Sequence, residues 1–162
     1  MQISKAIADL MNAQVGNELG ASNQYLQIAS YFDGESLSKL AKFFYNQSEE
    51  EREHAMKFVH YFMDVGAELS LAAIPAANTD IGTAEKAFEM SLNWELEVTS
   101  QINAMMELAI QEKDYASQAF LGWFVTEQVE EVSTMENMLQ VVRKAGEKNL
   151  LMVEAYLTHS AE

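Results

Sequence analysis

Four long stretches of the chain repeat apolar side chains every three or four residues, the spacing of one face of an α-helix. They cover residues 4–33, 37–65, 83–113 and 114–145. The 162 residues include one proline and seven glycines, and the proline, Pro75, lies outside all four stretches. No segment shows the alternation of a β-strand. The pattern therefore predicts an all-α protein with unusually long helices.

The residues between these stretches mark where the helices begin and end. Glycine is common just after a helix, and three glycines follow the first, second and fourth stretches: Gly34, Gly66 and Gly146. Short polar side chains accept hydrogen bonds from the free N–H groups of a first turn. We expect three of them to cap the second, third and fourth helices: Ser36, Thr83 and Asp114. Residues 147–159 predict a short fifth helix.

The lengths of the connections predict how the helices are arranged. The first and second helices are joined by a short turn, as are the third and fourth, so each pair should be antiparallel. Residues 67–82 can span roughly 53 Å at ~3.3 Å per residue, and a helix of this size is about 45 Å long. This segment can therefore run the full length of the bundle. The expected fold is a single domain, residues 1–162: a four-helix bundle with one long crossover and a short fifth C-terminal helix.

The apolar row of the second helix contains a carboxylate and an imidazole, Glu51 and His54, three residues apart on one face. The other members of the row are nearly all apolar: Leu40, Phe44, Gln47, Phe58, Phe62 and Val65. Burying a charged group alone is costly, so this pair should be matched by other charges or by a metal ion. Glu-x-x-His is also a spacing with which helix bundles hold pairs of metal ions.

Three further glutamates match Glu51 in depth. Glu18 lies sixteen residues before Gly34, and Glu51 lies seventeen after it, so the two share one height in an antiparallel hairpin. Glu95 and Glu131 lie nineteen and seventeen residues on either side of the last tight turn. Each of the four also lies on the apolar row of its helix. We therefore expect a carboxylate cluster in the middle of the bundle.

Such a cluster predicts a dinuclear metal site. Oxygen ligands with one imidazole suit iron, manganese or zinc rather than copper. Several carboxylates can bridge two ions, and their charge needs at least two dications to offset it. The spacing does not select among these metals. The alternative interpretation is that the four glutamates are solvated surface residues.

Composition narrows the classes of function. The net charge of −15 argues against nucleic acid and anionic membranes as partners. It is compatible with cation binding, and equally with a charge that serves only to keep the protein soluble. There is no cysteine, so thiolate sites and disulfides are excluded. The N-terminus has no leader-like pattern and no apolar stretch approaches membrane length. We expect a cytoplasmic protein.

Several local motifs together resemble the non-haem ferritins, close to the prokaryotic branch. They are residues 50–55 (Glu-Glu-Arg-Glu-His-Ala), the spacing from Glu18 to Tyr25, Trp94 followed by Glu95, and residues 123–128 (Trp-Phe-Val-Thr-Glu-Gln). The resemblance covers essentially the whole chain. It implies a homo-oligomeric cage of twenty-four subunits that oxidises Fe(II) with O2 or H2O2 at an intrasubunit di-iron site and stores ferric mineral inside.

The resemblance also implies roles for individual residues. Ligands of the first iron are Glu18, Glu51 and His54, and those of the second are Glu51, Glu95 and Glu131. Gln128 resembles a glutamine beside the site. Tyr25 resembles a tyrosine near it that either hydrogen-bonds a ligand or supplies an electron. A third iron site of prokaryotic ferritins corresponds to four glutamates: Glu50, Glu127, Glu130 and Glu131.

Departures from related di-iron proteins restrict the assignment. Bacterioferritins and rubrerythrin-like enzymes carry a second Glu-x-x-His on the last core helix, where this chain has Glu127-Gln128-Val129-Glu130-Glu131. Arg52 stands where bacterioferritins place a haem-ligating methionine, so we expect no haem. A di-iron oxidoreductase without mineral storage is the alternative enzyme, and a bundle without activity is the third hypothesis. The fifth helix should meet its symmetry copies around a fourfold axis, or else pack on its own bundle.

Overall fold

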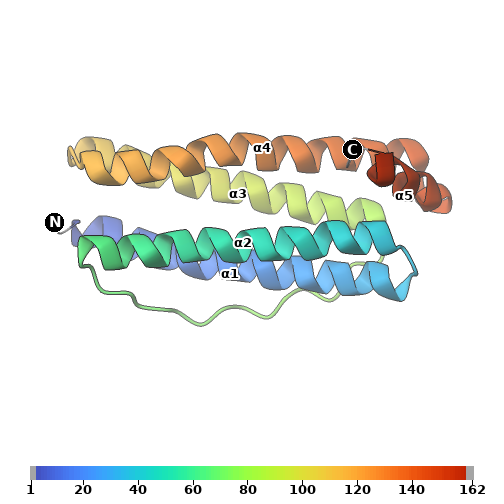
Figure 1. Cartoon of the computed structure of the whole chain (residues 1–162), viewed down its shortest axis with the longest axis horizontal. Coiled ribbons are helices and arrows are strands. Elements are labelled where there is room, and N and C mark those ends of the chain that lie inside the picture. The colour runs from blue at the N-terminus through green and yellow to red at the C-terminus, as the bar shows by residue number, and fades with distance from the viewer. Residues whose placement is uncertain (1–2, 160–162) are drawn as a thin grey trace.

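The computed structural model describes residues 3–159, and each regular element in that range is a helix (Figure 1). The elements are α1 (Lys5–Gly34), α2 (Ser38–Val65), α3 (Ala84–Gln111), α4 (Tyr115–Ala145), the 3-10 helix η1 (Glu147–Asn149) and α5 (Leu150–His159). The predicted all-α fold is thus confirmed. Among the described residues, none of the helices is both long enough and apolar enough to span a membrane.

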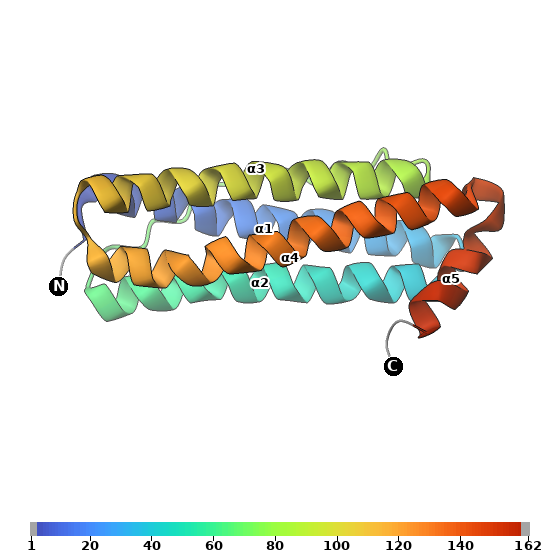
Figure 2. The same cartoon turned by 90° about the horizontal axis from the view of Figure 1, so that it is seen from above.

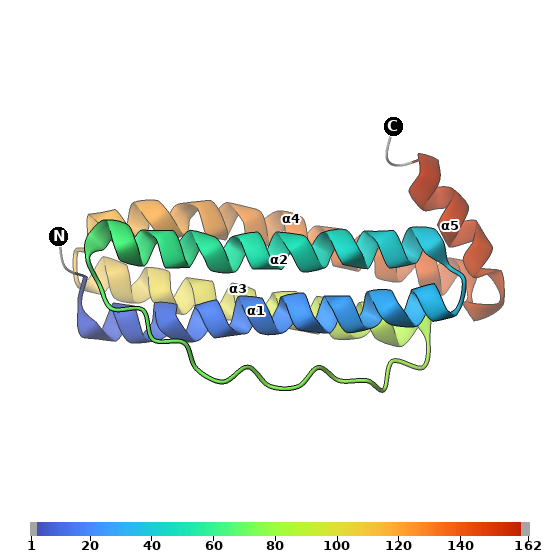
Figure 3. The same ribbon diagram turned by 60° about the horizontal axis from the view of Figure 1, so that its bottom comes forward.

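The connection between α2 and α3 runs along the bundle beside α1, as Figures 1 and 3 show. Two polar side chains of α1 hold it. Asn12 accepts a hydrogen bond from the Ser70 N–H at 2.7 Å. Gln24 accepts from the Asn78 N–H at 2.7 Å and donates to the Asn78 carbonyl at 3.0 Å. This segment is therefore the predicted crossover, and its course makes α2 and α3 parallel.

Two of the three predicted capping residues are confirmed. Thr83 accepts a hydrogen bond from the Lys86 N–H at 3.1 Å, and Asp114 accepts from the Ser117 N–H at 3.0 Å. Each begins its helix at the expected position, because its side chain replaces a backbone acceptor that the first turn lacks.

The prediction that Ser36 caps α2 is wrong. Ser36 has a φ of 60° and ends the turn after α1, where its N–H donates to the Asp33 carbonyl at 3.0 Å. The carboxylate of Glu154, from α5, accepts instead from the Lys39 and Leu40 N–H groups, at 2.9 and 2.8 Å. The cap of α2 therefore comes from a residue more than a hundred positions away.

α5 lies across one end of the bundle (Figure 2). Its Val153 is fully buried. In η1, which precedes α5, the Glu147 carboxylate accepts a hydrogen bond at 3.1 Å from the N–H of Ala84, at the start of α3. Leu151 and Met152 remain 75% and 67% exposed. The fifth helix thus packs on its own bundle with one face and leaves an apolar face uncovered in the single chain.

The core consists of two apolar clusters separated by a polar layer. The cluster near α5 includes Phe32, Phe44, Phe88, Val142 and Val153. The cluster at the other end includes Ile7, Phe58, Phe62, Ile102 and Phe124. Between them, all four long helices contribute buried polar side chains: Glu18, Glu51, His54, Glu95, Gln128 and Glu131. The two apolar clusters stabilise the ends of the bundle, and the polar layer between them contains the side chains that can bind a metal ion.

Candidate metal centre

Each long helix places one glutamate in the polar layer. Glu18 of α1, Glu51 of α2 and Glu95 of α3 are each 1% exposed, and Glu131 of α4 is 4% exposed. His54, one turn after Glu51, is 2% exposed. The structure therefore brings together the five residues that the sequence places at one depth, and shields them all from solvent.

The five residues form two groups that share Glu51. The first contains Glu18, Glu51 and His54, and the second contains Glu51, Glu95 and Glu131. Within each group, one ligand atom from every residue lies within 4.8 Å of the others. These are the two ligand sets that the resemblance implied for the first and second iron. Glu51 lies between them and can bridge two ions.

Apart from the contact that Glu18 and Glu51 make with each other, three buried atoms of the first group have no hydrogen-bond partner among the described residues: Glu18 Oε2, Glu51 Oε1 and His54 Nε2. Leaving a buried polar atom unpaired costs about 1–3 kcal/mol, more for charged groups. The imidazole is also near carboxylates on both sides, with Nδ1 3.4 Å from Glu51 Oε2 and Nε2 3.8 Å from Glu127 Oε1. A bound cation would satisfy carboxylate and imidazole atoms that the fold leaves open.

Burial and mutual repulsion alter the acidity of the site. Burial, followed by the charge of Glu51, raises the pKa of Glu18 well above its ordinary value. The pKa of Glu51 is raised in the same way by burial and by Glu95. For Glu131, burial and Glu95 raise the pKa to about 9. Without metal, Glu131 therefore holds its proton at neutral pH, and metal binding must displace it.

Two neighbours hold Glu95 from opposite sides. The Tyr25 hydroxyl donates to Glu95 Oε1. Gln128 Nε2 donates to Glu95 Oε2 at 3.3 Å and to its backbone carbonyl at 3.1 Å. Burial, and then the charge of Glu95, raise the pKa of Tyr25 well above its ordinary value, so this hydroxyl keeps its proton. Tyr25 and Gln128 thus both contact Glu95 of the candidate metal centre.

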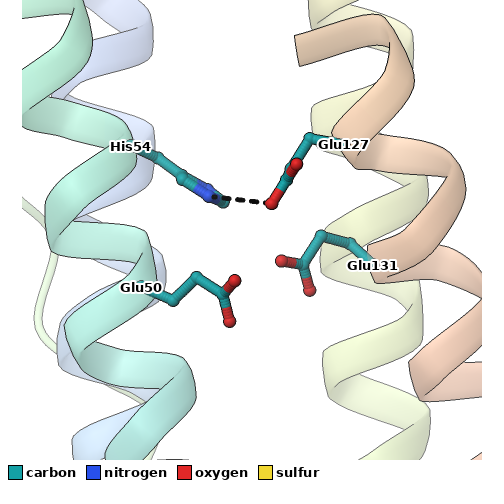
Figure 4. Close-up of side chains that lie close together, drawn as sticks. All are labelled: Glu50, His54, Glu127 and Glu131. Atoms are coloured by element: carbon teal, nitrogen blue, oxygen red, sulfur yellow. Dashed lines mark ion pairs between the residues drawn. The ribbon is translucent and has the colours of Figure 1, made fainter. Parts of the chain in front are cut away.

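A second cluster lies between α2 and α4, and we call it the α2–α4 cluster. Figure 4 shows Glu50 and His54 of α2 facing Glu127 and Glu131 of α4. One ligand atom from each of the four lies within 4.8 Å of the others. Glu50 and Glu127 are only half-buried, so this cluster lies nearer to solvent than the two deeper groups.

The α2–α4 cluster differs in one member from the third site expected from sequence. Glu130 is exposed and is not among the grouped residues, whereas His54 is. Glu130 still contributes charge, because it is among the acidic neighbours that raise the pKa values of Glu50 and Glu131, after burial and closer charges. The structure therefore places Glu130 at the rim of the cluster.

Sequence reasoning missed the functional relevance of two glutamines. Gln14 Nε2 donates to Glu18 Oε1 at 2.8 Å, and Gln47 Nε2 donates to Glu50 Oε2 at 2.8 Å. Both glutamines are buried. Each lies one turn before the glutamate it contacts, on an otherwise apolar row. In the sequence, a single amide side chain within an apolar row was the feature that could have indicated these contacts.

Comparison with known proteins agrees with this geometry. The sequence profile of the ferritin-like domain family matches residues 8–145. Ferritin BfrB of Mycolicibacterium smegmatis is 38% identical over 148 residues, covering 91% of this chain and 81% of that protein. The bacterial non-heme ferritin of Staphylococcus aureus (strain USA300) is 37% identical over 145 residues, or 90% and 87% of the two chains.

Solved structures show the same similarity. An open-pore ferritin from the hyperthermophilic archaeon Archaeoglobus fulgidus superimposes with a TM-score of 0.93 at 33% identity. The superposition covers 96% of this chain and 98% of the archaeal chain. Sequence, fold and the buried carboxylate–histidine layer therefore lead to one conclusion: the chain belongs to the ferritin family.

Proposed function

We propose that this protein stores iron and oxidises Fe(II) to Fe(III) at the centre formed by Glu18, Glu51, His54, Glu95 and Glu131. The observation that carries the proposal is the set of buried, unpartnered oxygen and nitrogen atoms in the first group, next to a second group that shares Glu51. Members of the ferritin family generally have ferroxidase activity, and the candidate ligands are of the hard oxygen type that iron accepts. We propose that residues 1–162 act as one ferritin-like di-iron domain.

Charge matching supports two Fe(II) ions as the substrate. Glu18, Glu51, Glu95 and Glu131 carry four negative charges once their protons have left, equal to the charge of two dications. One Fe(II) takes Glu18, His54 and Glu51, and the other takes Glu95, Glu131 and the second oxygen of Glu51. Binding releases the proton that burial holds on Glu131.

Oxidation upsets this balance and favours release. The two Fe(II) ions lose two electrons, which reduce one O2 to H2O2 or one H2O2 to two waters, each with uptake of two protons. The six charges of the ferric pair then exceed the four of the carboxylates. The excess favours loss of protons from water on Fe(III) and movement toward the additional carboxylates of the α2–α4 cluster, Glu50 and Glu127. That cluster is the proposed third iron site, with Glu130 at its rim.

Storage requires a cavity, which a single bundle does not have. We propose a homo-oligomeric cage of twenty-four subunits, as the resemblance to ferritins implies. The exposed apolar face of α5 supports assembly, because Leu151 and Met152 would be costly to leave in water. Closed symmetry around a fourfold axis would cover them with copies of the same helix.

Aerobic addition of Fe(II) to metal-free protein tests the proposal. Rapid-mixing absorbance should show fast oxidation of two irons per subunit, and size-exclusion chromatography should show a particle far larger than a dimer. Glu51→Ala should abolish the fast phase, and His54→Ala should chiefly weaken the first iron position. Glu107→Ala is the control, because Glu107 is exposed on α3, away from the centre.

The outcomes separate the competing hypotheses. Unchanged fast oxidation in Glu51→Ala would refute the di-iron assignment. Fast oxidation by a monomer or dimer would point to a di-iron oxidoreductase without storage. If the unaltered protein shows no stoichiometric oxidation of Fe(II), the result would support the third hypothesis, a helical bundle without this activity.

A further inference from the structure

A continuous chain of amide side chains connects the buried Glu18 to the surface. Gln14 Nε2 donates to Glu18 Oε1 at 2.8 Å. Asn17 Nδ2 donates to Gln14 Oε1 at 3.5 Å and to Gln101 Oε1 at 3.0 Å. Gln101 Nε2 then donates to the exposed Glu97 Oε1 at 3.1 Å. The chain joins α1 to α3 and has a carboxylate at each end.

The direction of these hydrogen bonds fixes the orientation of Gln14. Its carbonyl oxygen faces the Asn17 amide nitrogen, and its own amide nitrogen faces Glu18. Turning the Gln14 amide over would oppose its oxygen to the Glu18 carboxylate and its nitrogen to the nitrogen of Asn17. Both contacts would be repulsive, because each would pair two acceptors or two donors. Gln14 therefore presents a donor to Glu18 in a single orientation.

The contact divides the two oxygens of Glu18. Oε1 is occupied by the Gln14 amide, while Oε2 is buried and, apart from the contact between Glu18 and Glu51, has no hydrogen-bond partner among the described residues. Glu95 is held differently, because Tyr25 and Gln128 occupy both of its oxygens. At Glu18, in contrast to Glu95, a single buried amide distinguishes one oxygen from the other.

We propose that Gln14 is a positioning residue for the first iron: it holds Glu18 Oε1 and thereby directs Oε2 to the metal, so that Glu18 binds through one oxygen. This inference rests on the proposed di-iron function. Hydrogen bonds from neighbouring side chains commonly orient metal ligands, and losing one typically weakens metal binding by about 10–100-fold. Asn17 supports Gln14 from behind, and its loss should have a smaller effect of the same kind.

Gln14→Met tests the proposal, because methionine is unbranched, apolar and a good helix former, and removes the donor to Glu18 together with the acceptor that faces Asn17. The matched control is Gln24→Met, another buried glutamine of α1 that contacts the crossover instead of the metal centre. The probe is Co(II), which is stable in air and whose visible spectrum reports the ligands around it. Metal-free protein is titrated with Co(II), and thermal unfolding verifies that each variant folds.

The unaltered protein should bind two Co(II) ions per subunit at this centre, and Gln14→Met should weaken one of them by about tenfold or more. The spectrum of that ion should change, while the other ion and the Gln24→Met protein stay normal. Asn17→Ala should give a smaller weakening of the same ion. Equal affinities and spectra in Gln14→Met and the unaltered protein would overturn the positioning role alone. Failure of the unaltered protein to bind two ions would overturn it together with the proposed function.

Discussion

Replacing Glu131 by glutamine should stabilise the metal-free protein at alkaline pH and flatten the dependence of its stability on pH. Glu131 is 4% exposed, and burial followed by the charge of Glu95 raises its pKa to about 9. Glutamine keeps the shape of the side chain and removes the titrating proton. The change therefore isolates the free-energy cost of burying this carboxylate in the metal-free protein.

The sign and size of the effect follow from proton linkage. In the unfolded chain Glu131 regains its ordinary pKa near 4.5, so between that pH and about 9 the folded protein binds one more proton. The free energy of unfolding must then fall as pH rises, by ~1.4 kcal/mol per pH unit. From pH 6 to pH 8 the loss is about 3 kcal/mol. For a domain of this size that corresponds to roughly 6–12 °C in the unfolding temperature.

Scanning calorimetry at pH 6, 7 and 8, with a chelator present, measures the effect. The unaltered protein should lose this stability over the range, and Glu131→Gln should lose about 3 kcal/mol less. Glu107→Gln, which removes a negative charge from the exposed surface of α3, should follow the unaltered protein. Parallel curves for Glu131→Gln and the unaltered protein would refute the reasoning, because they would mean that Glu131 takes up no proton on folding.

The remaining predictions concern the rim of the site and the fifth helix. Glu130→Ala should leave the initial oxidation of two irons per subunit intact and alter later turnover, whereas Glu131→Ala should be impaired from the first iron added; identical stopped-flow traces would contradict this. Truncation after Gly146 should loosen the cage or reduce iron retention, measured by light scattering, yet spare fast oxidation. Glu154→Ala should lower the free energy of unfolding by about 0.5–2 kcal/mol, because α2 would lose the only side-chain cap that it has among the described residues; an unchanged unfolding temperature would show that this cap is dispensable.

Local chemistry made most of the fold predictable. The apolar rows specify helices because their spacing matches the helical repeat, and Thr83 and Asp114 cap helices with their own side chains. The depth of the carboxylate cluster was also predictable. In an antiparallel hairpin, equal numbers of residues on either side of a turn reach equal heights, which places Glu18 opposite Glu51.

Contacts between distant segments were not predictable in this way. Serine is a residue type that commonly caps helices, but Ser36 has a left-handed backbone conformation in the turn after α1. The cap of α2 comes from Glu154 instead. The resemblance to prokaryotic ferritins grouped Glu130 with Glu131. Adjacent residues on a helix point about 100° apart, and the packing of α4 against α2 turns Glu131 inward and leaves Glu130 exposed.

The sequence by itself determined which residue types reach the middle of the bundle, because helical periodicity and chain length set their face and height. Only the tertiary structure decided which carboxylate oxygens already accept a hydrogen bond from the protein. Gln14 occupies one oxygen of Glu18 and leaves the other open, while both oxygens of Glu95 are occupied. Such pairing depends on distances of about 3 Å between side chains on packed helices, and a linear pattern contains no information at that scale.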